Sequence, residues 1–86
     1  MYKIEFLKEA RDELNKIDPI WKKRIISKLK ILAENPDSLK NNIKKLKGKL
    51  TNFYRLRVGN YRIIFSYEDG KMIILIVRVG HRKEIY

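Results

Sequence analysis

Apolar side chains follow two different periods along this 86-residue chain, and the order of those periods leaves few folds open. Between residues 7 and 33 they recur every three or four positions, which predicts amphipathic helices. From residue 53 onward they mostly alternate with polar residues, as do Tyr2, Ile4 and Phe6, which predicts strands. We therefore expect an α+β fold in which two N-terminal helices pack on one face of a small, mostly antiparallel sheet of about four to five strands.

Asp18-Pro19 separates the two expected helices. The apolar stripe of the first helix consists of Leu7, Ala10, Leu14 and Ile17. Asp18 can cap the free N–H groups of a new helix, and Pro19 suits the first helical position, where its missing donor is not needed. This second helix should end at about Glu34, before Asn35-Pro36-Asp37. Its apolar stripe consists of Ile25, Ile26, Leu29, Leu32 and Ala33.

Turn-forming residues divide the rest of the chain into strands. We expect strands at residues 53–58, 61–68 and 72–79, joined by turns at Gly59-Asn60 and Asp69-Gly70. Residues 39–52 are rich in Lys and Asn and predict a loop that leads into a short edge strand. Gly80 is expected to break the last strand and release a short tail.

The length of the chain fits one compact domain spanning residues 1–86. There is no cysteine, which excludes disulfides, a thiolate nucleophile and thiolate metal ligands and agrees with a reducing cytoplasm. The first residues alternate apolar and charged side chains, unlike a signal peptide. The longest apolar run, residues 72–77, is far shorter than the ~18 residues of a membrane span, so we expect a soluble, cytoplasmic protein.

Positive charge is concentrated in the second half of the chain. Residues 1–37 hold nine Lys and Arg against seven Asp and Glu, whereas residues 38–86 hold twelve against three, within a total net charge of +11. Such a surface attracts polyphosphates through Coulomb attraction and counterion release. Charge alone does not separate RNA, DNA, an anionic membrane, an acidic protein partner or a merely solvated basic surface.

Strand alternation places three arginines on one side of the expected sheet. If Leu56 and Val58 face the helices, Arg55 and Arg57 face the open side, and Arg62 joins them from the next strand. Neighbouring guanidinium groups repel one another unless a carboxylate or a bound anion lies among them. The sequence between residues 38 and 67 contains no carboxylate for local pairing, which favours an anion site.

Two motifs resemble those of the RelE/ParE toxin superfamily. They are Gly-Asn-Tyr-Arg-Ile-Ile-Phe at residues 59–65 and Val-Gly-His-Arg-x-x-Ile-Tyr at residues 79–86, and the similarity extends over nearly the whole chain. The resemblance implies a toxin of a type II toxin–antitoxin module, restrained by a cognate antitoxin protein. In the ribonuclease branch of this family the toxin cleaves mRNA in the ribosomal A site without a metal or another cofactor. The other branch inhibits DNA gyrase and usually lacks the catalytic tail.

The same resemblance implies roles for residues of the C-terminal third. Arg62 is similar to the strand arginine that grips the scissile phosphate, and Arg82 to the arginine of the C-terminal motif. Arg55 and Arg57 fall where some members carry two lysines that contact RNA and assist proton transfer, a task for which arginine is poorly suited. Tyr86 matches the tyrosine that positions or deprotonates the attacking hydroxyl, although many relatives continue beyond it.

Proton transfer has two candidates, His81 and Tyr86, and the sequence does not decide between them. Histidine in general titrates near ~6.5, close to working pH, whereas tyrosine starts near ~10 and needs neighbouring cations. The resemblance favours Tyr86. A solvent-exposed residue after a glycine is the plain alternative for His81.

Further residues complete the expected RNA surface and its alternatives. Ribosome contacts are expected from residues 40–49, including Lys45, Lys47 and Lys49, and from Lys22, Lys23 and Arg24. The chain has one histidine and its acidic residues are scattered, so we expect no metal site. Trp21 is expected to anchor helix packing. The free toxin is expected to be monomeric. The competing interpretations are a gyrase inhibitor that cleaves nothing and a non-catalytic nucleic-acid-binding module.

Overall fold

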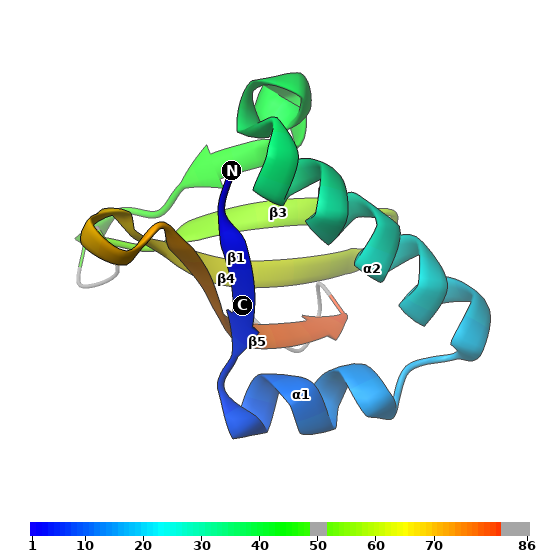
Figure 1. Ribbon diagram of the computed structural model, residues 1–86. Coiled ribbons are helices and arrows are strands. Elements are labelled where there is room, and N and C mark those ends of the chain that lie inside the picture. The colour runs from blue at the N-terminus through cyan, green and yellow to red at the C-terminus, as the bar shows by residue number, and fades with distance from the viewer. Residues whose placement is uncertain (49–51, 82–86) are drawn as a thin grey trace.

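The computed structural model describes residues 1–48 and 52–81 (Figure 1). Its elements are β1 (Lys3–Phe6), α1 (Lys8–Asn15), α2 (Pro19–Glu34), the 3-10 helix η1 (Pro36–Asn42), β2 (Ile43–Lys45), β3 (Tyr54–Val58), β4 (Tyr61–Glu68), the 3-10 helix η3 (Asp69–Lys71) and β5 (Ile73–His81). One strand and two α-helices precede the remaining strands, which confirms the expected α+β class.

The five strands form one sheet in the order β1-β5-β4-β3-β2. β1 pairs with β5 in parallel, and the other three pairings are antiparallel. The N-terminal strand therefore lies beside the last strand, and β2 forms the other edge, as expected. A register shift lies between β4 and β5: Ile64 pairs with Arg78 and Phe65 with Ile76, so Val77 is an extra residue on β5.

Local signals determine where α2 begins and ends. The Asp18 carboxylate accepts a hydrogen bond from Ile20 N at 2.9 Å, and a proline occupies the first helical position. The helix ends at Glu34, two residues before Pro36. By contrast, α1 has no side-chain cap, because Leu7 stands at its N-cap position and has no polar side-chain atom. Leu7 is also 43% exposed, although the periodicity predicted it in the buried stripe. No helix among residues 1–48 and 52–81 has both the length and the apolar composition to cross a membrane.

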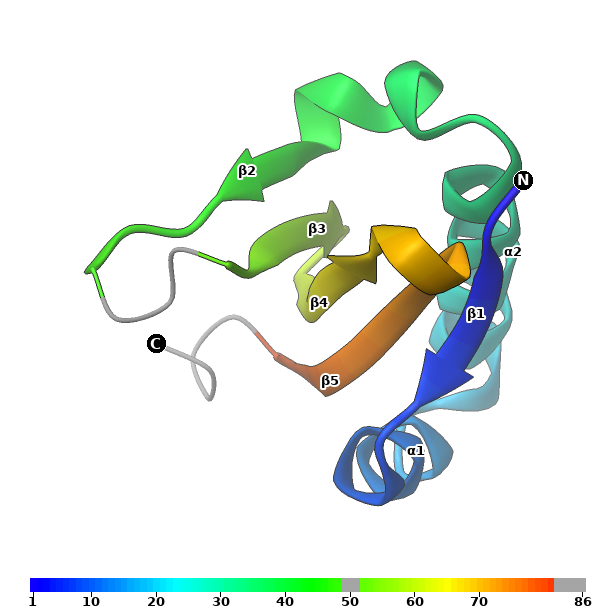
Figure 2. The same cartoon turned by 60° about the vertical axis from the view of Figure 1, so that its left-hand side comes forward.

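Both α-helices contribute to one core on one side of the sheet. Figure 1 shows α2 crossing the sheet and α1 running beside β5, and in Figure 2 neither α1 nor α2 lies on the other side of strands β2–β5. Leu56 and Val58 are buried against the helices, as alternation predicted. The buried core cluster consists of Ala10, Leu14, Ile25, Leu29, Leu32, Leu39, Leu56, Val58, Ile63, Phe65, Ile74, Ile76 and Val79.

Trp21 packs the N-terminal half of α2 against the turn between β3 and β4. Its ring lies 5.7 Å from the ring of Tyr61, centroid to centroid, and it belongs to the half-buried shell of the core. Gly59 in the turn has a φ of +58°, and a Cβ there would overlap the Cη2 and Cζ3 atoms of Trp21. The predicted hairpin and the anchoring role of Trp21 are confirmed, and the turn requires glycine for backbone and packing alike.

Three local predictions need correction. Gly80 does not end the last strand, because it pairs with Arg62 and β5 continues to His81. Asp69-Gly70 is part of a three-residue 3-10 helix rather than a two-residue turn, and Met72, with a φ of +55°, follows it before β5 starts. Residues 36–42 form η1 where part of a loop was expected, since Leu39 is buried and holds this segment against the core.

Candidate functional site

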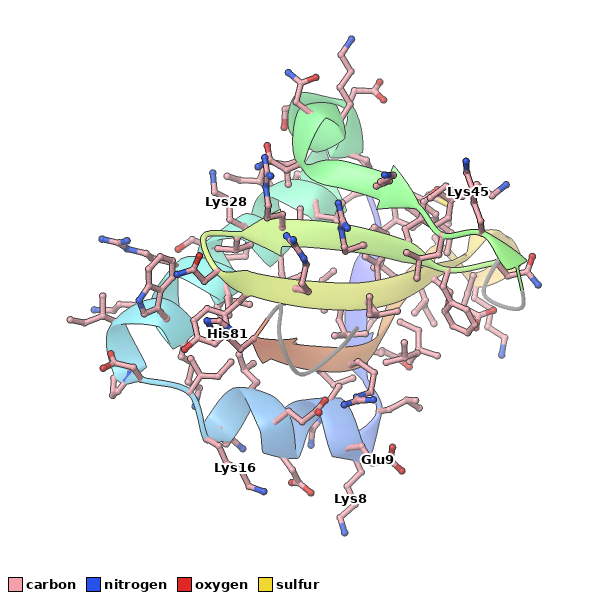
Figure 3. All side chains as sticks on the ribbon, turned by 180° about the vertical axis from the view of Figure 1, so that it is seen from behind. Lys8, Glu9, Lys16, Lys28, Lys45 and His81 are labelled. Carbon is pink, nitrogen blue, oxygen red and sulfur yellow. The ribbon has the colours of Figure 1, made fainter. Side chains whose placement is uncertain are left out.

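Four basic side chains lie on the face of the sheet that turns away from α2, which we call the cation face: Lys44, Arg55, Arg57 and Arg62. Arg57 on β3 lies directly opposite Arg62 on β4, and Arg55 lies opposite Ile64. Lys44 on β2 lies opposite Arg55. Figure 3 views this face and shows basic side chains on β3 and β4. Residues directly opposite each other in an antiparallel pair have Cβ atoms ~4.5–5.5 Å apart, so these charges are crowded.

The two arginines nearest the middle of the sheet are partly withdrawn from water. Arg57 is exposed, whereas Arg55 and Arg62 are half-buried. The Nε atom of Arg55 and the Nε and Nη1 atoms of Arg62 are buried. Charges at such depth are screened less by salt than surface charges, and a guanidinium group presents several donors in a plane that matches phosphate oxygens. The arrangement can bind a phosphate group and stabilise added negative charge on it.

The edge strand β2 contributes a residue that sequence reasoning missed. Its register places Lys44 opposite Arg55 but Lys45 opposite Tyr54, so Lys44 is the lysine that shares the cation face. Figure 3 shows Lys45 at the end of β2, pointing outward, and Lys47 is exposed beyond it. The signal for Lys44 is the pairing register, which a three-residue strand within a Lys-rich segment does not reveal by its pattern.

His81 lies on the other side of the sheet from the cation face. It pairs with Tyr61, which packs against the core, and the two rings meet edge to face with centroids 5.8 Å apart. A hollow of about 460 Å³ beside them is lined by these residues together with residues 13, 16–18 and 79–80. Figure 3 shows His81 near one end of the sheet. The structure therefore does not bring His81 together with Arg62, the next residue after Tyr61 on β4.

Three predicted site residues, Lys49, Arg82 and Tyr86, lie outside the described residues. Arg82 follows His81, the last residue of β5, and Gly80 is the residue opposite Arg62. The described part of β5 therefore ends directly before Arg82 in the sequence.

The strand register places a further arginine, Arg78, on the cation face, but Arg78 forms an ion pair with Glu13 of α1. Arg78 is opposite Ile64, and its Nε atom donates to both carboxylate oxygens of Glu13 at 3.2 and 3.1 Å. Its Nη2 atom donates to Glu13 Oε2 at 3.0 Å, and Glu13 Oε1 also accepts from Val79 N at 2.9 Å. Sequence reasoning missed this pair because 65 residues separate the partners and only the tertiary fold brings them together.

Basic residues of α2 form a separate feature on the helix side of the sheet. The guanidinium carbon of Arg24 lies 4.8 Å from the centroid of the Trp21 ring, which is a cation–π contact. Lys23, Arg24 and Lys28 line a hollow of about 600 Å³ together with this ring. In the described part of the chain, no three His, Cys, Asp or Glu side chains gather closely enough to hold a metal ion.

Known sequences place this chain among toxins. The family model described as ParE toxin of type II toxin-antitoxin system, parDE, matches residues 4–86. Toxin RelG of Mycobacterium tuberculosis is 30% identical over 88 residues, which cover 99% of this chain and 95% of that protein. Toxin RelE3 of Methanocaldococcus jannaschii is 52% identical over 50 residues, which cover 58% of this chain and 53% of that toxin.

Solved structures agree with the sequence matches. One chain of the RelB-RelE antitoxin-toxin complex from Methanococcus jannaschii has a TM-score of 0.73 and 37% identity, and the match covers 94% of this chain and 93% of that chain. The matched range of the family model includes every residue of the cation face. The chain therefore belongs to the RelE/ParE superfamily of toxins from type II toxin–antitoxin systems.

Proposed function

We propose that the chain is an endoribonuclease that cleaves mRNA in the ribosomal A site and thereby inhibits translation. The observation that carries the proposal is the cross-strand pair of Arg57 and Arg62, on a face that also holds Arg55 and Lys44. Like charges directly opposite one another destabilise a sheet. A bound phosphate backbone places anionic oxygens beside both guanidinium groups, so the arrangement suits an anionic ligand.

The proposed reaction is attack of a ribose 2′-OH on the adjacent phosphorus. It requires a base for the hydroxyl, stabilisation of charge on the phosphorane and an acid for the leaving 5′-oxygen. Arg62 binds the scissile phosphate and stabilises the developing charge, and Arg82 adds a second guanidinium group from the segment after β5. Arg55 and Arg57 hold the RNA backbone beside it. These guanidinium groups supply the positive charge, so the proposed reaction uses no metal ion and no other cofactor.

Tyr86 is the proposed proton-transfer group. The ring of His81 packs on Tyr61, on the side of the sheet opposite Arg62. A phosphate held by Arg62 would therefore lie across the sheet from the imidazole. This geometry supports Tyr86 over His81, in agreement with the family resemblance.

Two macromolecular partners belong to the proposal. The first is a cognate antitoxin with an acidic, amphipathic segment, which would cover exposed apolar side chains such as Ile20, 64% exposed, and neutralise the positive charge. The solved Methanococcus jannaschii relative, a RelB-RelE complex, supports this partner. The second is the ribosome, contacted by residues 40–49 and by Lys22, Lys23 and Arg24. The free toxin is proposed to be a monomer.

Inhibition of DNA gyrase is the second candidate function, and the ParE description of the matching family model favours it. Such a toxin binds protein and cleaves nothing. Gyrase inhibition does not explain why arginines crowd the cation face. It also does not explain why Arg82 and Tyr86 resemble residues of the ribonuclease branch. We therefore rank it below RNA cleavage.

Cleavage of mRNA on programmed ribosomes tests the proposal. Purified wild-type protein should cut at the A-site codon, and Arg62→Ala should slow the cut by about 100-fold or more, because one preorganised donor to the transition state is lost. Arg82→Ala and Tyr86→Phe should also slow it, whereas the exposed Arg11→Ala on α1 serves as a matched control. Undiminished cutting by Arg62→Ala and Arg82→Ala contradicts the mechanism. No cutting by the wild type, together with inhibited gyrase supercoiling, would establish the second candidate instead.

A further inference from the structure

The outer edge of β5 is covered by β1 only along its first part. The parallel pairing ends with Phe6 opposite Ile76, and Leu7 N donates to Ile76 O at 2.9 Å. Beyond this point α1 begins at Lys8 and runs beside β5 (Figure 1). A strand edge without a neighbouring strand has N–H groups that require another acceptor.

Glu13 of α1 supplies an acceptor at this edge. Its Oε1 atom accepts a part-buried hydrogen bond from Val79 N at 2.9 Å. The same carboxylate is bound by the Nε and Nη2 atoms of Arg78 at 3.0–3.2 Å. Charge-assisted bonds of this two-pronged kind orient a carboxylate as well as attract it. The Glu13 side chain is therefore held between the helix and the strand.

The Val79 amide lies between the irregularity of β5 and the residue opposite Arg62. Val77, the extra residue created by the register shift, precedes it by two positions, and such an irregularity locally bends a strand and disrupts its ladder. Gly80, opposite Arg62, follows it directly. The Glu13 bond thus restrains β5 after the irregularity and before the segment that begins at Arg82.

We propose that Glu13 is a positioning residue of this toxin. The hydrogen bond from Val79 N to its carboxylate holds the end of β5 in place and so sets the position of Gly80 beside Arg62. The inference rests on the proposed ribonuclease function, in which Arg62 and Arg82 bind the scissile phosphate. Glu13 itself touches no RNA in this scheme.

Two conservative variants separate the hydrogen bond from the charge. Glu13→Gln keeps an oxygen at the same reach for Val79 N but loses the negative charge that pairs with Arg78. Glu13→Asp keeps the charge but withdraws the carboxylate by one methylene group from Val79 N. Asp12→Asn, one position earlier on α1 and exposed, is the matched control. Amide hydrogen exchange at Val79 reports whether each variant retains the bond, and circular dichroism shows that each is folded.

Single-turnover cleavage on programmed ribosomes then gives the decisive comparison. Glu13→Asp should lower the rate constant about 10- to 100-fold, the effect of a displacement of roughly 1 Å in a catalytic group, with an unchanged half-saturating toxin concentration. Val79 should lose protection in this variant. Glu13→Gln should keep the protection and most of the rate, and Asp12→Asn should match the wild type.

Other results overturn the inference. Equal rates for Glu13→Asp and the wild type, despite lost protection at Val79, would show that the bond positions nothing that matters to cleavage. A loss of rate only in Glu13→Gln would assign the effect to charge rather than to the backbone bond. Equal losses in Glu13→Gln and Glu13→Asp, with Val79 still protected in Glu13→Gln, would show that the bond to Val79 N does not set the rate. A wild type that cuts no RNA refutes the proposed function itself, which is a different observation from an active wild type with an insensitive Glu13.

Discussion

Arg57 and Arg62 stand directly opposite each other on β3 and β4, with no intervening residue along the pairing direction. Arg57 is exposed and Arg62 half-buried, so their mutual repulsion is only partly screened. Gly80, which follows in the same row on β5, brings no side chain of its own to this face. The row therefore places two positive charges beside a β5 position that has no side chain.

Replacement of Arg57 should make the protein more stable and a weaker RNA binder. Arg57→Thr introduces a β-branched residue, which suits a strand, and removes one member of a like-charged pair. The expected change of ~0.2–1 kcal/mol raises the melting temperature by about 1–8 °C. Calorimetry and RNA-binding titration should show the two opposite changes. Lys3→Thr in β1, opposite Ile73, is the control and should give no such rise. A lower melting temperature for Arg57→Thr would show that the repulsion is already relieved within the protein.

Lys44 should contribute more to RNA affinity than Lys45, although the two are adjacent in the sequence. Lys44 lies opposite Arg55 and Lys45 opposite Tyr54, so only Lys44 adds to the cation face. In binding to single-stranded RNA at several salt concentrations, Lys44→Ser should reduce the slope of log K against log salt by about 0.7, the effect of one lost phosphate contact. Lys45→Ser should reduce it less. Equal effects, or a larger effect of Lys45→Ser, would contradict the assignment of the face by register.

His81→Asn should leave the pH dependence of RNA cleavage unchanged. The imidazole packs edge to face on Tyr61, across the sheet from Arg62, and is too poorly placed to exchange a proton with a phosphate-bound ribose. Single-turnover rates measured across the acidic range should give the same profile for wild type and variant. Tyr86→Phe should slow the reaction in the same assay. Loss of the acidic limb in His81→Asn would make His81 the titrating group and refute the assignment to Tyr86.

Much of the fold could be predicted because its signals are local. Asp18-Pro19 starts α2, Pro36 follows its end, and the buried side chains alternate in β3 as expected. The arginines of the cation face follow from the same alternation. The prediction that Gly80 ends the last strand is wrong. A glycine is tolerated inside a strand when its neighbours pair, and the pairing of Gly80 with Arg62 depends on the folded sheet.

The long-range contacts of the site could not be predicted in the same way. The Glu13–Arg78 pair and the bond to Val79 join segments that are distant in the sequence, and nothing in an amphipathic helix distinguishes Glu13 from its exposed neighbours. The placement of His81 beside Tyr61 depends on β5 extending past Gly80. Each case depends on register or tertiary packing, which a single sequence specifies only through the whole fold.

Among Gly48, Gly59 and Gly70, Gly59 should be the least replaceable, for reasons that the other two glycines separate. Gly59→Ala forces a Cβ into the left-handed region and into the ring of Trp21, so strain and overpacking together should destabilise the fold by about 2–5 kcal/mol. Gly48→Ala, with a φ of +72° but open space, should lose only about 1–2 kcal/mol, and Gly70→Ala should be nearly neutral. Urea unfolding measures all three. A Trp21→Phe background, which removes the overlapped ring carbons, should shrink the Gly59→Ala loss toward that of Gly48→Ala, and an undiminished loss would show that the backbone alone requires this glycine.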